Sequence, residues 1–205
     1  MTKEEYKKKY DKDVEAHKGA EKIAVEVLNK LNIGYHFEDV SDDEEYYNKG
    51  DIKMTKDNKI RFMDVKDDGE IAHTGNFYVE AGGYSKIYGT KKQGWIDSKY
   101  NYVAVVSQQE NTIWILSFRK LKEYYKNVAL TGGRKVTSNF WDNVKYGYTF
   151  PVEKAIELGV VMGKITYEYD DWIEEHTPVK YLNKKKLKDK ELIRNAQGEC
   201  SFFNA

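Results

Sequence analysis

Close to residue 50 the spacing of the hydrophobic residues changes from helical to strand-like, and this change limits the possible folds more than any other feature of the sequence. Before it, in the segment GAEKIAVEVLNKLN, apolar residues recur every three or four positions and form one stripe. This spacing predicts a helix over about residues 3–32, with Gly34 as its terminator. After it, apolar and polar residues alternate in GDIKMTK and in IRFMDVK. That pattern predicts two strands joined by a tight turn at Asp57-Asn58.

The remainder of the chain predicts an α/β protein with a mixed central β-sheet flanked by helices. The acidic segment FEDVSDDEEYYNKG, the stretch up to Gly75 and the glycine-bearing segment AGGYSKIYGTKKQGW are expected to be loops. The other expected elements are, in order, the strands NFYVE, YNYVAVV and TIWILS, the helices FRKLKEYYKN and PVEKAIELG, the strand VMGKITYEY and the basic helix KYLNKKKLKDKELIR. Such an order packs helices against a sheet and adds a helical C-terminal extension. We expect residues 1–126 to form the core and residues 127–205 to pack on it, as an extension or as part of the same domain.

Composition favours a folded cytoplasmic protein and leaves its partner open. The chain of 205 residues is 40% apolar and has only two prolines, which is typical of a globular protein. Its 34 basic and 34 acidic residues give a net charge of zero, so any surface for nucleic acid must be local. The sequence has no apolar run long enough for a membrane span and no apolar signal region after its charged start. A single cysteine, Cys200, cannot form an internal disulfide, which fits a reducing compartment.

Two acidic residues and one lysine of the predicted hairpin are the strongest candidates for a catalytic site. Cleavage of a phosphodiester requires a bound cation, an activated water molecule and neutralisation of charge at the phosphoryl group. Asp51 begins one predicted strand and Asp64 lies late on the next, so antiparallel pairing can bring their carboxylates together. Asp64 and Lys66 are two residues apart in a strand and therefore point to the same face. The pattern predicts two carboxylates around a hard cation such as Mg²⁺, with an ammonium group beside them.

A non-functional interpretation of this pattern, as ordinary surface charge, competes with the catalytic one. Aspartate and lysine are abundant here, so a D-x-K triplet also arises by chance on a solvated surface. Asp64 and Lys66, however, alternate with apolar residues in the segment FMDVK. Charged groups placed against a core usually have a function or a charged partner.

The segment from Glu21 to Lys122 resembles the PD-(D/E)XK nuclease superfamily, in particular nuclease-like proteins common in phage genomes and relatives of archaeal Holliday junction resolvases. GDI at residues 50–52 is similar to the PD element, with glycine in place of proline, and DVK at residues 64–66 is similar to the (D/E)XK element. GAEKIAVEVL is similar to the family's first helix, in which Glu21 takes the place of a metal-facing glutamate and Glu26 is the alternative. The segments TGNFYVE, QGWIDSKYNYVAVV and ILSFRKLK are similar to the stretches that follow in the phage-type proteins.

This resemblance implies a metal centre and a role for each matching residue. Asp51, Asp64 and the carbonyl of Val65 would bind Mg²⁺ or Mn²⁺. Lys66 would position the attacking water molecule, and Glu21 would support the ligands of the metal. The resemblance also implies products that carry a 5′-phosphate and a 3′-hydroxyl group.

The strand NFYVE and the loop after it supply weaker candidates. Glu80 and Asn76 lie on one face of that strand, where they could be additional metal or water ligands, or where Glu80 could simply pair with a lysine. The loop combines cations with aromatic rings, which suits nucleic acid and equally suits a loop folded over the core. Its candidate nucleic-acid-binding residues are Lys86, Lys91, Lys92 and Trp95. The histidines show no metal-ligand spacing and are expected to be structural or surface residues.

The sequence therefore predicts a magnesium- or manganese-dependent nuclease with nucleic acid, DNA rather than RNA, as its partner. Sequence motifs for serine hydrolases, phosphate-binding loops and zinc proteases are absent. Two alternatives stay open. One is a non-catalytic factor on the same fold that binds nucleic acid or another protein, and the other is a site-specific restriction endonuclease whose recognition region lies in residues 127–205. A homodimer is compatible with each of them.

Overall fold

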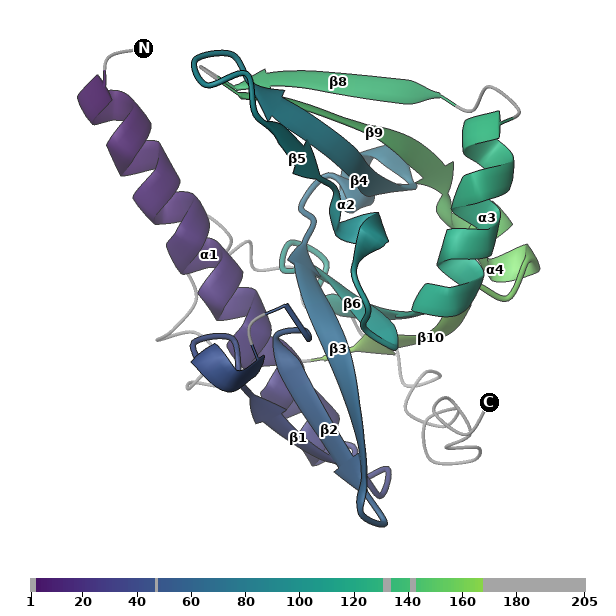
Figure 1. Cartoon of the computed structure of the whole chain (residues 1–205). Helices are drawn as coiled ribbons and strands as arrows, with labels where there is room; N and C mark the ends of the chain where they lie inside the picture. The colour runs from purple at the N-terminus through teal and green to yellow at the C-terminus, as the bar shows by residue number, and fades with distance from the viewer. Residues whose placement is uncertain (1–2, 47, 131–133, 141–142, 168–205) are drawn as a thin grey trace.

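The central sheet of the protein is mixed, as the sequence predicted, and the α/β class is confirmed. The computed structural model (Figure 1) describes residues 3–46, 48–130, 134–140 and 143–167. Within them a six-stranded sheet has the order β1-β2-β3-β6-β7-β10. Its strands are β1 (His36–Asp39), β2 (Ile52–Lys56), β3 (Lys59–Asp67), β6 (Tyr102–Ser107), β7 (Thr112–Ser117) and β10 (Val161–Thr166). Strands β3 and β6 run parallel, and the other neighbouring pairs are antiparallel.

A second sheet, with the order β5-β4-β9-β8, lies on one side of the central sheet. Its strands are β4 (Asn76–Ser85), β5 (Lys91–Gln93), β8 (Lys135–Phe140) and β9 (Asn143–Pro151). The short elements between strands are η1 (Glu44–Tyr46), α2 (Ile71–Thr74), η2 (Trp95–Asp97) and α4 (Val152–Glu157). Helix α3 (Phe118–Leu130) lies on the same side as the second sheet, whereas helix α1 (Lys3–Lys30) lies on the opposite side (Figure 1).

Strand β6 is the centre of the core because both of its faces are buried. Ala104 and Val106 belong to a hydrophobic cluster with the apolar stripe of α1, and Val103 and Val105 belong to a second cluster with β4, β9 and α3. A strand that is buried on both faces is expected to be a continuous apolar run, as YVAVV is. The stripe of α1 packs as its spacing predicted. Among the described residues, no helix is long and apolar enough to cross a membrane.

The β2–β3 hairpin forms at the predicted turn. Asp57 and Asn58 both have positive φ angles, 49° and 60°, as a two-residue hairpin turn of type I′ requires. The predicted loop over residues 81–95 was partly wrong, because residues 81–85 belong to β4 and residues 91–93 form β5, which pairs with β4, while residues 86–90 form the turn between them. The sequence concealed β5 because Lys91–Gln93 is exposed along its whole length and has no apolar face. The predicted loop after Phe37 was partly wrong for a similar reason, since β1 buries only that residue.

The segment after residue 126 is built differently from the helical extension that the sequence predicted. Between residues 134 and 167 its described part consists of β8, β9, α4 and β10. Strand β9 pairs with β4, and β10 pairs with β7, so this segment completes both sheets. The helix α4 and the strand β10 lie where they were predicted, whereas β8 and β9 were missed. The predicted basic helix at residues 180–194 lies outside the described residues.

Gly94 allows η2 to begin directly against β4. A Cβ atom at this position would collide with the backbone of Glu80 and Ala81. We expect Gly94→Ala to lower the free energy of unfolding by about 1–3 kcal/mol, as overpacking does, measured by urea denaturation. Gly69→Ala is the matched control because a Cβ there would meet only the side chain of Gln109, at 3.3 Å. Equal stability of the two variants would show that η2 can move away from β4 without loss.

Candidate metal and catalytic site

Asp51 lies immediately before β2, across from Asp64 on β3. Ile52 pairs with Met63 in the hairpin, so the next position along brings Asp51 opposite Asp64. The Asp51 amide donates to the Met63 carbonyl oxygen at 3.0 Å, and the Val65 amide donates to Asp51 Oδ2 at 2.7 Å. The Asp51 carboxylate is therefore held against the backbone of β3. The preceding residue, Gly50, also helps to position Asp51. Its φ angle is 133°, and it lies too close to the Met63 carbonyl oxygen to carry a side chain.

Asp64 and Lys66 lie on one face of β3 and form an ion pair. Lys66 Nζ is 2.5 Å from Asp64 Oδ2, and Asp64 is only 7% exposed. Met63 and Val65, between and beside them, pack into the cluster that contains α1. Lys66 Nζ also lies 5.8 Å from the centre of the Trp95 ring. The hairpin thus brings the three residues Asp51, Asp64 and Lys66 into one site.

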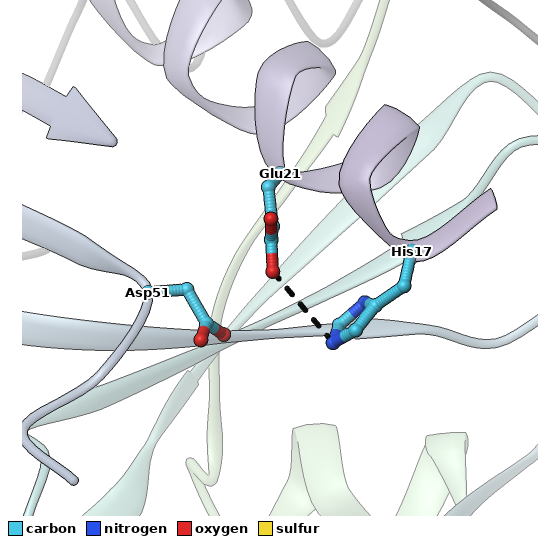
Figure 2. A group of neighbouring side chains, drawn as sticks. All are labelled: His17, Glu21 and Asp51. Carbon is cyan, nitrogen blue, oxygen red and sulfur yellow. Dashed lines mark ion pairs between the residues drawn. The ribbon is translucent and has the colours of Figure 1, made fainter. Parts of the chain in front are cut away.

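Helix α1 contributes Glu21 and His17 to the same site (Figure 2). These two residues are four positions apart and lie on one face of the helix, with His17 Nε2 3.7 Å from Glu21 Oε1. One ligand atom from each of His17, Glu21 and Asp51 lies within 4.8 Å of the others. A carboxylate pair with an imidazole at this separation can hold a divalent cation. Asp64 is not part of this three-residue group.

The expectation that the histidines are structural or surface residues stays a prediction for His17. It compared histidines with one another, whereas the partners of His17 are carboxylates. The signal that could have found it is the pair His17 and Glu21, which are four residues apart in a predicted helix. His73, the histidine nearest to the DVK segment in the sequence, is exposed on α2, and His36 is exposed on β1. His176 lies outside the described residues.

The site holds its acidic groups in a poorly hydrated, negatively charged environment. Burial and, after it, the negative charge of Asp51 raise the pKa of Glu21 to about 7. The pKa of Asp64 is raised to about 6 as the net result of burial, which raises it most, of the positive charge of Lys66, which lowers it, and of Asp51, which raises it. The pKa of His17 is lowered, first by burial and then by the positive charge of Lys66. A neutral imidazole is the form that binds a metal ion.

Tyr100 closes the site on the side of Asp64 and was not identified from the sequence. Its hydroxyl group donates to the Trp95 carbonyl oxygen at 3.0 Å. Burial and then the charge of Asp64 raise the pKa of Tyr100, so the phenol stays protonated. Trp95 stacks on Phe118 with 6.2 Å between ring centres, which fixes the aromatic wall beside Lys66.

No protein-family model, no curated protein and no solved structure matches this chain. The functional argument therefore depends on the geometry and chemistry of the site.

The weaker sequence candidates lie apart from this constellation, with the exception of Trp95. Glu80 pairs with Lys145 across β4 and β9 at 3.0 Å, which matches the alternative interpretation that this carboxylate pairs with a lysine. The side-chain amide of Asn76 donates to the Thr74 carbonyl oxygen at 2.6 Å. Lys86, Lys91 and Lys92 are exposed on the β4–β5 hairpin. Glu26, the alternative to Glu21, pairs with Lys30 at 2.7 Å.

The acidic segment after β1 adds to the negative charge near Glu21. The charges of Asp39 and Asp42 both raise the pKa of Glu21. Asp42 also pairs with Lys18 of α1 at 2.7 Å, which ties the segment to the helix beside the site. A negative field at the approach to the site attracts cations. This placement gives the acidic segment a physical role that its sequence alone did not reveal.

Proposed function

We propose that this protein is a metal-dependent nuclease that hydrolyses phosphodiester bonds in DNA, built on a restriction-endonuclease-like PD-(D/E)XK core. The observation that supports the proposal is the convergence of Glu21, Asp51, Asp64 and Lys66 from one helix and one hairpin. These are the residues for which the sequence resemblance implies a joint role. Buried carboxylates with raised pKa values in one site are typical of functional sites.

The residues present fit a divalent cation. Glu21, Asp51 and His17 offer three ligand atoms. Burial and the charge of Asp51 raise the pKa of Glu21, and a bound cation would favour the charged carboxylate instead. Mg²⁺ is satisfied by one or two carboxylates with water molecules, whereas the imidazole of His17 favours Mn²⁺. When bound, the cation activates water and neutralises charge on the phosphoryl group.

Side chains of the protein would provide the other functions that hydrolysis requires. Lys66 has an ammonium group beside Asp64 and would hold the attacking water molecule or offset charge on the phosphate. Asp64 would orient Lys66 and take part in the metal shell once its own pKa is lowered by the cation. Asp51 would be kept in place by its hydrogen bond from the Val65 amide. The role of the Val65 carbonyl as a metal ligand stays a prediction.

One observation favours a second candidate function, a non-catalytic binding protein on the same fold. Lys66 already neutralises Asp64 at 2.5 Å in a pocket from which water is largely excluded. A site whose acidic group is satisfied by a lysine does not need a metal ion for stability. In such a protein the exposed lysines and tyrosines of the β4–β5 hairpin would contact the partner.

The direct test is a cleavage screen. Single-stranded, duplex and branched DNA, together with RNA, are incubated with the protein and Mn²⁺ or Mg²⁺, beside Asp64→Ala. We expect cleavage of DNA that needs the cation, leaves a 5′-phosphate and is lost in EDTA and in the variant. Identical digestion by wild type and variant would point to a contaminating nuclease, and no digestion of any substrate would favour the binding protein.

Cation binding has its own signature in thermal stability. Millimolar Mg²⁺ or Mn²⁺ should stabilise the wild type by mass action, by about 2.7 kcal/mol at a hundredfold excess over the dissociation constant. For a chain of this length, this corresponds to a rise in Tm of about 5–10 °C. Calcium should also raise Tm without supporting cleavage, because its looser shell positions water poorly.

Asp51→Asn should abolish the rise in Tm, whereas Asp57→Asn should keep it. Asp57 is the matched control because it is an exposed aspartate of the same hairpin, in a turn position that asparagine tolerates. A melting curve of the wild type that ignores all three cations would contradict a metal centre at this site.

A further inference from the structure

A basic hollow lies at one end of the central sheet, outside the carboxylate site. It encloses about 430 Å³ and takes one residue from each of four neighbouring strands: Arg61 of β3, Tyr102 of β6, Ser117 of β7 and Met162 of β10. The beginning of α3 forms another wall with Phe118, Arg119, Lys120 and Lys122. Lys99, Tyr100 and Asn101 complete it.

The charged side chains that line this hollow are all positive. Five cationic side chains line it, and among the described residues no carboxylate does. Lys99, Arg119 and Lys120 form no ion pair with any carboxylate in the described part of the chain. Lys122 is held in place by a bond to the Ser98 carbonyl oxygen at 2.7 Å and by the Phe118 ring at 4.5 Å. Cations gathered in a concave surface repel one another unless an anion joins them.

The direction of α3 adds to this positive field. Two of the cations, Arg119 and Lys120, lie in the first turn of the helix, which contains no acidic residue, and Lys122 follows at the start of the second turn. The amino end of a helix carries partial positive charge, so this placement is the reverse of the one that stabilises a helix. The arrangement lowers the stability of the free protein and becomes favourable when a negative group lies at the helix end.

We propose that this hollow binds the phosphate group of a nucleotide, carried either by a free mononucleotide or by a nucleic acid strand. Arg119 offers a guanidinium group, whose planar donors match two phosphate oxygens. Arg61 is oriented by its hydrogen bond to the Tyr102 hydroxyl group. The volume exceeds that of a lone phosphate and leaves room for the attached sugar, beside the rings of Tyr100 and Tyr102. The inference does not depend on cleavage at the carboxylate site.

The hollow and the carboxylate site share Tyr100. This residue lines the hollow, and the charge of Asp64 acts on its hydroxyl group. A strand whose phosphate is held in the hollow would therefore lie one side chain away from Asp64. This proximity connects the two sites without making either depend on the other.

The test measures binding in EDTA, so that a metal at the carboxylate site plays no part. The probes are inorganic phosphate, deoxyadenosine monophosphate and a short 5′-phosphorylated single-stranded DNA, each titrated by calorimetry. The variant Arg119→Gln/Lys120→Gln removes two cations of the hollow. The control Lys7→Gln/Lys126→Gln removes two exposed cations outside it, one of them on the same helix.

We expect the wild type and the control to bind the nucleotide probes alike and the hollow variant to bind at least about tenfold more weakly. Equal affinity for the mononucleotide and the DNA identifies a free nucleotide as the ligand, and tighter binding of the DNA with stronger salt dependence identifies a strand. Absence of binding by the wild type at millimolar nucleotide would overturn the proposal. Equal binding by the two double variants would do the same, and inorganic phosphate binding as tightly as the nucleotide would refute the nucleotide assignment.

Discussion

Replacing Lys66 by alanine, or Asp64 by asparagine, is expected to reduce the rate of metal-dependent cleavage by about 10²–10³-fold, as loss of one charge-stabilising group typically does. Lys66 and Asp64 are joined at 2.5 Å, so either change removes the ammonium group from its present position or releases it. Neither side chain fills the hydrophobic core, whose β3 residues are Met63 and Val65. The effect should therefore fall on the rate of the chemical step, measured in single turnover at saturating Mn²⁺.

The matched control for this pair is Lys53→Ala. Lys53 also lies on the hairpin and also pairs with a carboxylate, that of Glu38 at 3.0 Å, but it is not part of the site. Its loss should leave the cleavage rate within about twofold, because exposed ion pairs contribute little. Undiminished cleavage by both site variants, with circular dichroism melts that match the wild type, would place the catalytic centre elsewhere.

The hairpin and its site could be predicted because their signals are local. Two residues with positive φ, Asp57 and Asn58, fix the register of β2 against β3, and a fixed register decides which side chains share a face. The alternation in FMDVK then places Asp64 beside Lys66. The helical stripe of α1 was equally local, and it brought Glu21 to the face that packs on the sheet.

The missed elements depended on contacts between distant parts of the chain. Strand β5 has no buried residue and exists because its backbone pairs with β4. Strand β9 pairs with β4 although the two are distant in sequence: the paired residues Asn76 and Pro151 are more than seventy positions apart. The spacing of apolar residues within a short segment does not predict such pairings, because these strands are stabilised by the sheet that they complete.

The residues of the site that were missed have the same explanation. Tyr100 precedes β6 and looks like an ordinary strand residue in YNYVAVV, and only the parallel pairing of β3 with β6 brings it to Asp64. The basic hollow draws on four strands and one helix, and its cations are spread from Arg61 to Lys122. The net charge of zero gives no sign of this hollow, because acidic residues elsewhere in the chain balance its positive charges.

The affinity of the site for Mg²⁺ or Mn²⁺ is expected to rise steeply with pH. Binding a cation requires ionised carboxylates, and the pKa of Glu21 is raised by burial and by Asp51 to about 7. Below that pH each bound ion must displace the proton of Glu21, so this residue alone should raise the affinity by about tenfold per pH unit. Above about pH 7 the increase should stop, because Glu21 is then ionised before the metal arrives.

The stability of the metal-free protein should change in the opposite direction. The pKa of Glu21 rises on folding from 4.5 to about 7, and that of Asp64 from 3.8 to about 6. Between these limits the folded state binds more protons than the unfolded state, so stability falls as the pH rises through them. The stabilising contribution of these two protonated groups is fully present below their pKa values in the unfolded chain and is lost above their pKa values in the folded protein. Added metal should therefore raise Tm most at about pH 7.5 and least at about pH 5.

Calorimetry in two buffers of different ionisation enthalpy measures both the affinity and the number of protons released. The decisive variant is Glu21→Gln, which cannot ionise and should remove the Glu21 part of both pH dependences, leaving the part that Asp64 contributes around and below about pH 6. Glu26→Gln is the matched control, because Glu26 lies on the same helix but pairs with Lys30 at 2.7 Å. It should keep the pH dependence of the wild type. A wild-type affinity that is constant across the range, or a Glu21→Gln variant that releases as many protons on binding as the wild type, would show that Glu21 is not a ligand of the metal.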